Sequence, residues 1–227
     1  MIYNDYAAII KILFLKYFKN LIKNQKKLFW NLFHPDNLLV FEYANAAERI
    51  GWEYVSKKLH LYKSICELGC VNGRITSILK DLIADKKYIG YDLNFFGITV
   101  AKIRNIFNIN RNLSFKCKNA FFACEEKSEL FVSIGTVIYF SEKQLLEFLK
   151  KLKLSKSFKS FIMHEIFLDE SLDNGKSIFV KDKYLHSISK IKTIFGKDYK
   201  INVIPTSYPI WETKGRISAI LVIEKSI

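Results

Sequence analysis

The ten residues from Ser64 to Gly73 constrain the fold of this chain more than any other stretch. They begin with the apolar pattern of a short buried strand, continue through Glu67 and Gly69, and lead into a helical pattern that starts near Arg74. Glycine lets the backbone turn sharply and approach a ligand closely, and the first N–H groups of a helix point into the same space. The stretch therefore predicts a strand, a tight turn and a helix that together cradle a nucleotide.

A second carboxylate stands where such a fold needs one. Asp92 lies near the end of the strand-like stretch Lys87–Asn94, about 20 residues after Gly73, which is the separation at which a carboxylate contacts ribose hydroxyls in dinucleotide-binding folds. An ionised carboxylate accepts two hydrogen bonds from a cis-diol. We therefore predict that Asp92 holds a ribose, although the spacing alone also fits a nicotinamide dinucleotide.

The stretch 64–73 resembles motif I of the class I S-adenosylmethionine (SAM) methyltransferases, in which an acid is followed by three glycines at alternate positions. Glu67, Gly69 and Gly73 match this motif, and Val71 stands where the family has its middle glycine. A β-branched residue disfavours positive φ, so either the turn keeps Val71 in an ordinary backbone region or the pocket is altered. The resemblance implies that SAM is the cofactor and S-adenosylhomocysteine (SAH) its product. It also implies that this half of the cofactor site comprises Glu67, Gly69, Cys70, Gly73, Asp92 and Leu93.

Strand and helix patterns alternate through residues 61–227, which predicts an α/β fold with a doubly wound, mostly parallel sheet. The predicted helices are 74–84, 95–107, 142–152 and a basic helix within 179–195. The later strands are predicted within 113–120 and 129–140, each of which includes the loop that follows the strand, and over 160–166, 201–205 and 217–224. The last two strands resemble the antiparallel pair that closes the seven-stranded class I methyltransferase sheet. We therefore expect a methyltransferase-like domain over 61–227 and an N-terminal helical extension or lid over 1–60.

The resemblance continues after the third and fourth predicted strands. Where the family has an acid and a small residue beside the adenine amino group, this chain has Asn119 and Ala120; an Asn carbonyl also accepts an N–H, although Asn equally serves a turn. Ser133 and Gly135 match the strand end that passes the methionine part of SAM. Tyr139 follows at a position that is often aromatic or His in small-molecule members, and it is a candidate catalytic residue.

Two further candidate catalytic residues lie in the fifth predicted strand. Ligands of such sheets bind beyond the carboxyl ends of the strands, so we expect His164 and Glu165 near the reactive centre. Methyl transfer from a sulfonium needs mainly positioning, and a hydroxyl acceptor additionally benefits from a base. His164 is the leading candidate base and Glu165 the second, although a lone His at a strand end is commonly structural.

The N-terminal region has two helical patterns. The first, over 6–32, is basic and amphipathic, so it either caps the domain or lies on an anionic membrane surface. The second, over 38–59, places Tyr43 and Trp52 where helices before motif I often form a lid in the resembled family. These two aromatic side chains are candidate acceptor contacts, with ordinary aromatic core as the alternative.

Charge and cysteine content restrict the partners. The chain of 227 residues has a formal net charge of +14, which favours anionic partners without choosing among them. Its four cysteines have no zinc-like spacing, so we expect no metal, and free thiols suit a reducing compartment. Lysines interrupt the apolar N-terminal stretch before it could span a membrane. These features predict a cytoplasmic protein.

The resemblance implies a SAM-dependent methyltransferase. The chain lacks the Asn/Asp-Pro-Pro-Tyr/Phe tetrapeptide of base amino-methylases and the Pro-Cys nucleophile of cytosine C5 methylases. We therefore expect O-methylation of a small molecule, or of a sugar or glycan precursor, with an anionic acceptor favoured by the charge. An RNA methyltransferase is the alternative that the +14 charge supports, and a non-catalytic SAM-binding scaffold is the alternative that Val71 and Asn119 support. The oligomeric state is not indicated.

Overall fold

The computed structural model describes residues 45–106, 112–169, 171–180, 182–207 and 215–226. The predicted helix over 6–32 and the candidate acceptor residue Tyr43 lie outside these ranges. Within them, the structure contains no helix with the length and apolar character that a bilayer crossing requires.

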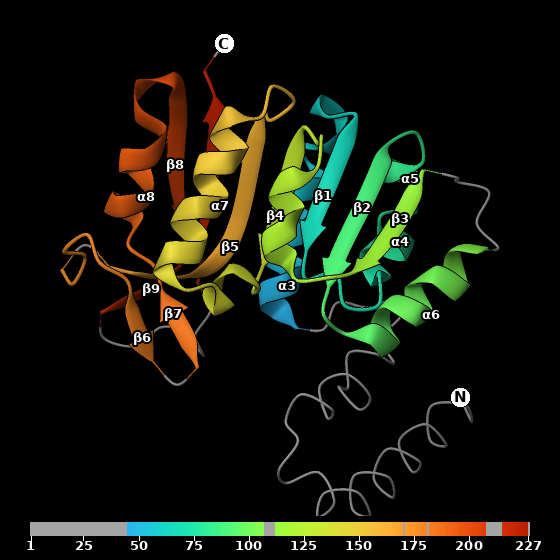
Figure 1. The fold of residues 1–227 in the computed structure, drawn as a ribbon, viewed down its shortest axis with the longest axis horizontal. Helices are drawn as coiled ribbons and strands as arrows, with labels where there is room; N and C mark the ends of the chain where they lie inside the picture. The colour runs from blue at the N-terminus through green and yellow to red at the C-terminus, as the bar shows by residue number, and fades with distance from the viewer. Residues whose placement is uncertain (1–44, 107–111, 170, 181, 208–214, 227) are drawn as a thin grey trace, which may run out of the picture.

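Seven strands form one sheet in the order β3-β2-β1-β4-β5-β9-β8 (Figure 1). Strands β1 to β5 pair in parallel, and β9 runs antiparallel to both β5 and β8. Their bounds are β1 Ser64–Leu68, β2 Lys87–Asp92, β3 Leu113–Cys117, β4 Leu130–Ile134, β5 Ser160–Leu168, β8 Tyr199–Pro205 and β9 Arg216–Lys225. The predicted mostly parallel sheet with a closing antiparallel pair is confirmed. The strand order reverses between β1 and β4, and ligands of open α/β sheets bind at such a switch point.

Helices cover both faces of the sheet, as predicted for a doubly wound fold (Figure 1). One face packs against α3 Ala46–Ser56, α4 Arg74–Ile78, α5 Lys80–Ile83 and α6 Phe95–Ile106. The other face packs against η3 Ala120–Glu125, α7 Glu142–Leu154 and α8 Ile188–Phe195. Two buried hydrophobic clusters, one on each face, form the core. The remaining short helices are η2 Leu59–Leu61, η4 Val137–Tyr139 and η5 Gly196–Asp198.

Two segments differ from the sequence-based expectation. The predicted helix 74–84 breaks at Leu79, since φ and ψ there are −105° and 25°; Ile75, Thr76 and Ile78 are β-branched, which weakens a continuous helix. Residues 178–185 were not recognised as strands. They form a separate hairpin of β6 Ile178–Val180 and β7 Lys183–Leu185, and these strands are too short to produce a clear alternation in the sequence.

The placement of Trp52 corrects a third expectation. Helix α3 packs on β4 and β5, and a Cβ on its Gly51 would lie 2.7 Å from Ile134 Cδ1, so the helix sits close against the sheet. Trp52 faces the same way, with 2% of its surface exposed, and belongs to the hydrophobic cluster on that side. The interpretation of Trp52 as an acceptor contact is therefore wrong, and the aromatic-core alternative is correct.

We expect Trp52→Ala to lower the free energy of unfolding by about 3–5 kcal/mol, because it leaves a large cavity in a packed core. The adjacent Glu53 is exposed on the same helix, so Glu53→Ala should change this free energy by less than about 0.5 kcal/mol. Urea unfolding measures both variants. A Trp52→Ala protein as stable as Glu53→Ala would contradict this packing.

Candidate functional site

The loop between β1 and α4 has an unusual backbone. Gly69, Val71 and Gly73 have φ values of 81°, 49° and 67°, so every second residue is in the left-handed region. The N–H groups of Gly69 and Cys70 both donate to the Tyr91 carbonyl, at 2.7 and 3.1 Å. This pairing joins the loop to the end of β2 and bends the chain at the carboxyl edge of the sheet.

Val71 adopts the conformation that a glycine would have at its position. The left-handed region costs a residue with a Cβ roughly 1–2 kcal/mol. Two contacts hold it there: the Val71 N–H donates to Asp92 Oδ2 at 2.8 Å, and its carbonyl oxygen lies so close to Gly97 that a Cβ there would be 2.5 Å away. Of the two alternatives that the sequence left open, an ordinary backbone region for Val71 is therefore wrong.

The Asp92 carboxylate lies at the end of β2, directly across from the loop. Its Oδ1 accepts the Asn94 N–H at 2.7 Å and its Oδ2 accepts the Val71 N–H. Burial raises the pKa of Asp92, and the backbone N–H groups oppose that rise. Each carboxylate oxygen can accept a further hydrogen bond from a hydroxyl group. The neighbouring Leu93 is 54% exposed, so an apolar surface lies next to the carboxylate.

Glu67 lies beneath the loop and is 5% exposed. The Tyr88 hydroxyl donates to its Oε2, and burial raises the pKa of Glu67 to about 8. On the same side, Arg74 makes a two-pronged ion pair with Glu48, with N···O distances of 2.7 and 3.1 Å. The Glu67 side chain is therefore held in the interior by Tyr88 of the neighbouring strand β2. The Glu48–Arg74 pair, which links α3 to α4, was missed because no local pattern connects two residues 26 apart.

The end of β4 forms the other side of the switch point. Gly135 has φ 71°, and no atom of the described residues lies within 4 Å of the position that a Cβ would take there, so Gly135 borders space that these residues leave open. The next residue, Thr136, packs against the loop, since a Cβ on Gly69 would lie 1.9 Å from Thr136 Oγ1. Ser133 is fully buried and donates to Glu165 Oε1 at 2.7 Å. Sequence reasoning missed Thr136, because its contact arises only when β1 and β4 are neighbours.

Glu165 holds the segment after β4 in place. Its Oε1 also accepts the N–H groups of Thr136 and Val137, at 3.0 and 2.9 Å. Burial raises its pKa to about 7, and these donors oppose that rise. The side chain is fully buried. This placement makes Glu165 a positioning residue for the end of β4, and its candidate role as a base stays a prediction.

His164 points to the opposite face of β5, toward α3, because successive strand residues alternate. Its Nδ1 donates to the Ala47 carbonyl at 2.8 Å, so Nε2 accepts from the Thr206 hydroxyl at 3.0 Å. The ring is fully buried, and burial lowers its pKa. Strand β5 continues beyond it to Leu168. The expectation that His164 lies at a strand end is wrong, and the structure supports its structural alternative.

Tyr139 is 49% exposed at the end of η4, and Lys183 Nζ from β7 lies 5.8 Å from its ring centroid. Burial raises its pKa. His186, which sequence reasoning missed together with the hairpin, donates through Nε2 to the Val137 carbonyl at 3.0 Å. This hydrogen bond fixes the segment after β7 against η4 and so positions Tyr139.

The remaining candidates lie around the loop. Cys70 is buried with its sulfur against Gly90, where a Cβ would be 2.6 Å away. Asn119 accepts the Phe121 N–H at 2.9 Å and so caps η3, and Ala120 follows it in the core. No group of three or more His, Cys, Asp or Glu side chains is arranged to hold a metal in the described ranges.

Comparison with known proteins agrees with this geometry at the level of fold. The chain matches no protein-family model and no curated protein in sequence. In structure it is similar to the N-terminal domain of EvdMO1 with SAH bound, at TM-score 0.59 and 15% identity, covering 82% of each chain. It is also similar to SAH-bound magnesium protoporphyrin IX methyltransferase from Synechocystis PCC 6803, at TM-score 0.58 and 15% identity, covering 90% of this chain and 100% of that one.

A third similar structure is a putative SAM-dependent methyltransferase from Listeria monocytogenes, at TM-score 0.54 and 16% identity, covering 79% of this chain and 100% of that one. These likenesses show that the chain has the class I SAM-dependent methyltransferase fold. The fold that the motif I resemblance implied is therefore confirmed.

The raised pKa of Glu67 predicts a pH-dependent stability. Between pH 5 and 8 the folded protein keeps a proton on Glu67, whereas the unfolded chain, with a pKa near 4.5, has released it. The contribution of Glu67 to stability therefore falls as the pH rises, by up to about 1.4 kcal/mol per pH unit. We expect the free energy of unfolding of the wild type to fall relative to that of Glu67→Gln with this slope, measured by urea unfolding at four pH values. A difference that does not change with pH would contradict the burial of Glu67.

Proposed function

We propose that this protein is a SAM-dependent methyltransferase that transfers a methyl group to an oxygen atom of a small molecule, or of a sugar or glycan precursor. The observation that carries the proposal is the left-handed backbone at residues 69, 71 and 73, tied to Asp92 through the Val71 N–H. This cradle lies at the switch point between β1 and β4, where the fold binds its ligand. Similar folds have been crystallised with SAM or SAH.

The residues present fit such a cofactor. The open space at Gly135 lies beside the loop, since the adjacent Thr136 packs on Gly69. Asp92 would hold the ribose hydroxyls, and Leu93 would cover one face of the adenine. Asn119 keeps a second lone pair on its carbonyl oxygen for the adenine amino group. When bound, SAM supplies an electrophilic methyl group on a sulfonium. The loop, Asp92 and the end of β4 then orient that group toward the acceptor side of the carboxyl edge.

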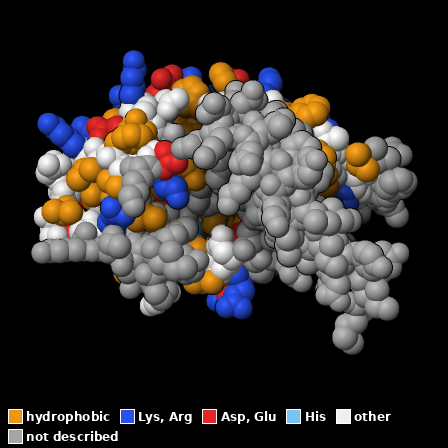
Figure 2. Space-filling view, turned by 90° about the horizontal axis from the view of Figure 1, so that it is seen from below, with side chains coloured by type: hydrophobic (Ala, Val, Ile, Leu, Met, Phe, Trp, Pro, Cys, Tyr) orange, Lys and Arg blue, Asp and Glu red, His pale blue; other side chains and the backbone are white. Residues whose placement is uncertain are grey.

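The acceptor side lies next to η4 and the β6–β7 hairpin. Figure 2, which views the molecule from the side of the carboxyl edge, shows on its left hydrophobic side chains with both basic and acidic side chains among them. Exposed apolar residues of this region are Tyr139, Leu172, Ile178 and Phe179. These apolar side chains, together with Lys183 next to Tyr139, would bind an acceptor molecule that carries both an apolar part and a negatively charged group. Among similar structures, the N-terminal domain of EvdMO1 was crystallised in the presence of SAH and D-fucose, and another is the O-MT of StiE.

Positioning does most of the work in this mechanism. In-line displacement at a sulfonium needs an acceptor oxygen held behind the methyl group. His164 and Glu165 are fully buried and hydrogen-bonded within the protein, whereas Tyr139 is exposed at this edge, so the Tyr139 hydroxyl is the group available to an acceptor. Because its pKa is raised, the hydroxyl is protonated at neutral pH and donates a hydrogen bond that orients the acceptor. The proton that the acceptor oxygen loses on methylation then passes to solvent and not to Tyr139.

Binding of SAH tests the cofactor assignment. We expect the wild type to bind SAH and Asp92→Asn to bind at least about tenfold more weakly, because one charge-assisted acceptor of the ribose hydroxyls is lost. Asp81 is an exposed acid on α5, so Asp81→Asn is the matched control and should bind as the wild type does. Isothermal titration calorimetry measures all three. Equal binding by both variants would remove Asp92 from the site, and no binding by a folded wild type would favour a scaffold without cofactor.

Tyr139→Phe tests the acceptor side. Because the lost hydroxyl orients only the acceptor, we expect unchanged SAH affinity and a roughly 10- to 100-fold lower rate of methyl transfer from labelled SAM to a responsive acceptor. The acceptor is found by screening hydroxylated small molecules, sugars and glycan precursors. If Tyr139→Phe transfers methyl groups as fast as the wild type, Tyr139 has no part in orienting the acceptor.

A further inference from the structure

The edge of the sheet opposite the candidate site carries a row of lysines. We call it the amino edge: the first residues of β1, β2, β4, β5 and β8 and the last residues of β9, at the top of Figure 1. The Lys87 N–H donates to the Lys63 carbonyl at 3.0 Å, and the Lys225 N–H donates to the Lys159 carbonyl at 2.8 Å. These backbone hydrogen bonds place the lysines of each pair side by side along the edge. Tyr199, at the start of β8, then pairs with Lys225. The row therefore crosses the width of the sheet from β2 to β8.

The exposed lysines of this edge outnumber its acids. They are Lys57, Lys63, Lys87, Lys127, Lys156, Lys159, Lys197, Lys200 and Lys225. The acids of the edge are Asp85, Glu129, Asp198 and Glu224. Glu129 pairs with Lys159 at 2.8 Å, Glu224 pairs with Lys58, and Asp85 pairs with Lys86 at 3.5 Å. The edge therefore presents a strip of positive charge.

Two exposed leucines flank this strip. Leu154, at the end of α7, is 83% exposed, and Leu61, at the end of η2, is 56% exposed. They lie on opposite faces of the sheet, because α7 covers one face and the α3–η2 segment the other. The strip is thus bordered on both sides by an apolar side chain that extends into solvent.

Exposed aromatic side chains gather at the other edge. Among the described residues, those with large exposed areas are Phe95, Phe96, Phe122, Tyr139 and Phe179, which all follow the carboxyl ends of strands. The aromatic residues at the amino edge, such as Tyr62, Tyr88 and Tyr199, are buried. Single-stranded nucleic acids bind by stacking bases on exposed aromatic rings, whereas lysines with protruding leucines suit a lipid surface.

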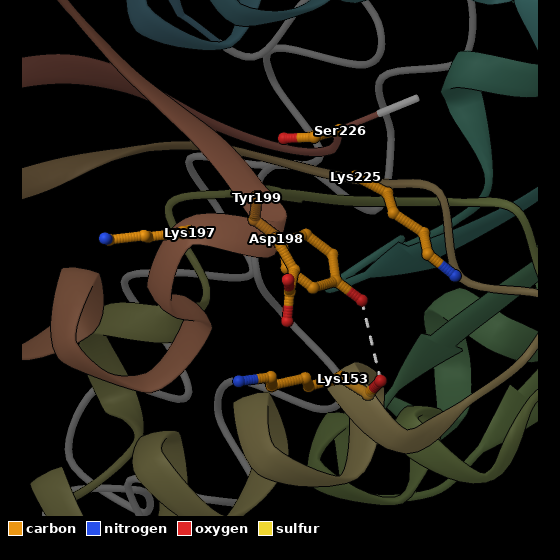
Figure 3. Close-up of a pocket in the computed structure, with 6 residues that line it drawn as sticks. All are labelled: Lys153, Lys197, Asp198, Tyr199, Lys225 and Ser226. Atoms are coloured by element: carbon orange, nitrogen blue, oxygen red, sulfur yellow. Dashed lines mark hydrogen bonds between the residues drawn. The ribbon is translucent and has the colours of Figure 1, made fainter.

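One cavity lies at this edge, with a volume of about 430 Å³, lined by Lys153, Lys197, Asp198, Tyr199, Lys225 and Ser226. Figure 3 shows the amino groups of Lys153 and Lys197 on one side and that of Lys225 on the other. Lys153 is already engaged, since its Nζ donates to the Ile194 carbonyl at 2.8 Å. The amino groups do not converge on one point, which fits a charged surface spread over many headgroups better than a site for one small anion.

We propose that the amino edge binds the surface of an anionic lipid bilayer, with the lysine strip against the headgroups and Leu61 and Leu154 inserted at their level. The strands separate this edge from the carboxyl edge by roughly 17 Å, given five residues at about 3.3 Å each. The candidate cofactor site therefore faces away from the bilayer. Membrane binding and SAH binding are independent in this arrangement, so the proposal does not rest on the proposed function.

Co-sedimentation of the full chain with vesicles tests the proposal. We expect binding to phosphatidylcholine vesicles that contain 30% phosphatidylserine, weak binding to pure phosphatidylcholine, and a loss of affinity as salt rises. Each lysine near such a surface contributes about fivefold in affinity. The variant Lys63→Gln, Lys87→Gln, Lys156→Gln, Lys225→Gln should therefore lose at least about 100-fold. Leu154→Ser should weaken binding by a further severalfold.

The matched control removes four exposed lysines on helices away from the edge, as Lys102→Gln, Lys143→Gln, Lys190→Gln, Lys192→Gln. It has the same net charge and should bind vesicles within about threefold of the wild type. Equal losses of vesicle affinity in the two variants would overturn the proposal, because the attraction would then depend on net charge alone. Unchanged vesicle affinity in the edge variant would also overturn it, because the membrane-binding residues would then lie elsewhere in the chain. Tight binding of the wild type to an RNA duplex without binding to vesicles would also overturn it, in favour of a nucleic acid. Unfolding curves and SAH titration of both variants verify that the fold is intact.

Discussion

The candidate site depends on one hydrogen bond, from the Val71 N–H to the Asp92 carboxylate at 2.8 Å. A left-handed residue with a Cβ costs roughly 1–2 kcal/mol, and a hydrogen bond to a charged group contributes about 1.5–3 kcal/mol. The bond is therefore strong enough to offset the strain. It also couples two elements: the loop after β1 takes the shape of a three-glycine turn with two glycines, and the carboxylate after β2 is held facing that loop.

The polar residues of β4 and β5 act as supports for this edge of the sheet. Glu165 accepts hydrogen bonds from the Ser133 hydroxyl and from the N–H groups of Thr136 and Val137, and so fixes the turn that begins at Gly135. His164 joins the other face of β5 to α3. Buried polar groups are costly unless they are hydrogen-bonded, and the Ser133 hydroxyl, the His164 ring and Oε1 of Glu165 are all bonded within the protein. The acceptor-orienting group that we propose, the Tyr139 hydroxyl, belongs to a side chain that is exposed at the carboxyl edge.

Local patterns predicted most of the fold. The strand from Ser64, the carboxylate Asp92 and the helix that Ser141 caps are encoded by residues close together in the chain, and all three are present. The errors concern properties that depend on distant packing: the burial of Trp52 follows from α3 lying on β4 and β5, and the partners of His164 come from residues 47 and 206. The left-handed conformation of Val71 depends on distant packing in the same way, because it is set by Asp92 and by the close approach of Gly97.

The most direct test of the central claim is a titration of ¹⁵N-labelled protein with SAH, followed by the amide resonances in NMR spectra. The Val71 N–H lies between the loop and Asp92, so its resonance should shift saturably, together with those of Gly69, Gly73 and Gly135. Amides of the amino edge, such as those of Lys63 and Lys225, should stay in place. A titration in which the Val71 and Gly69 resonances do not move, while the protein remains folded, would contradict the assignment of this loop as the cofactor cradle.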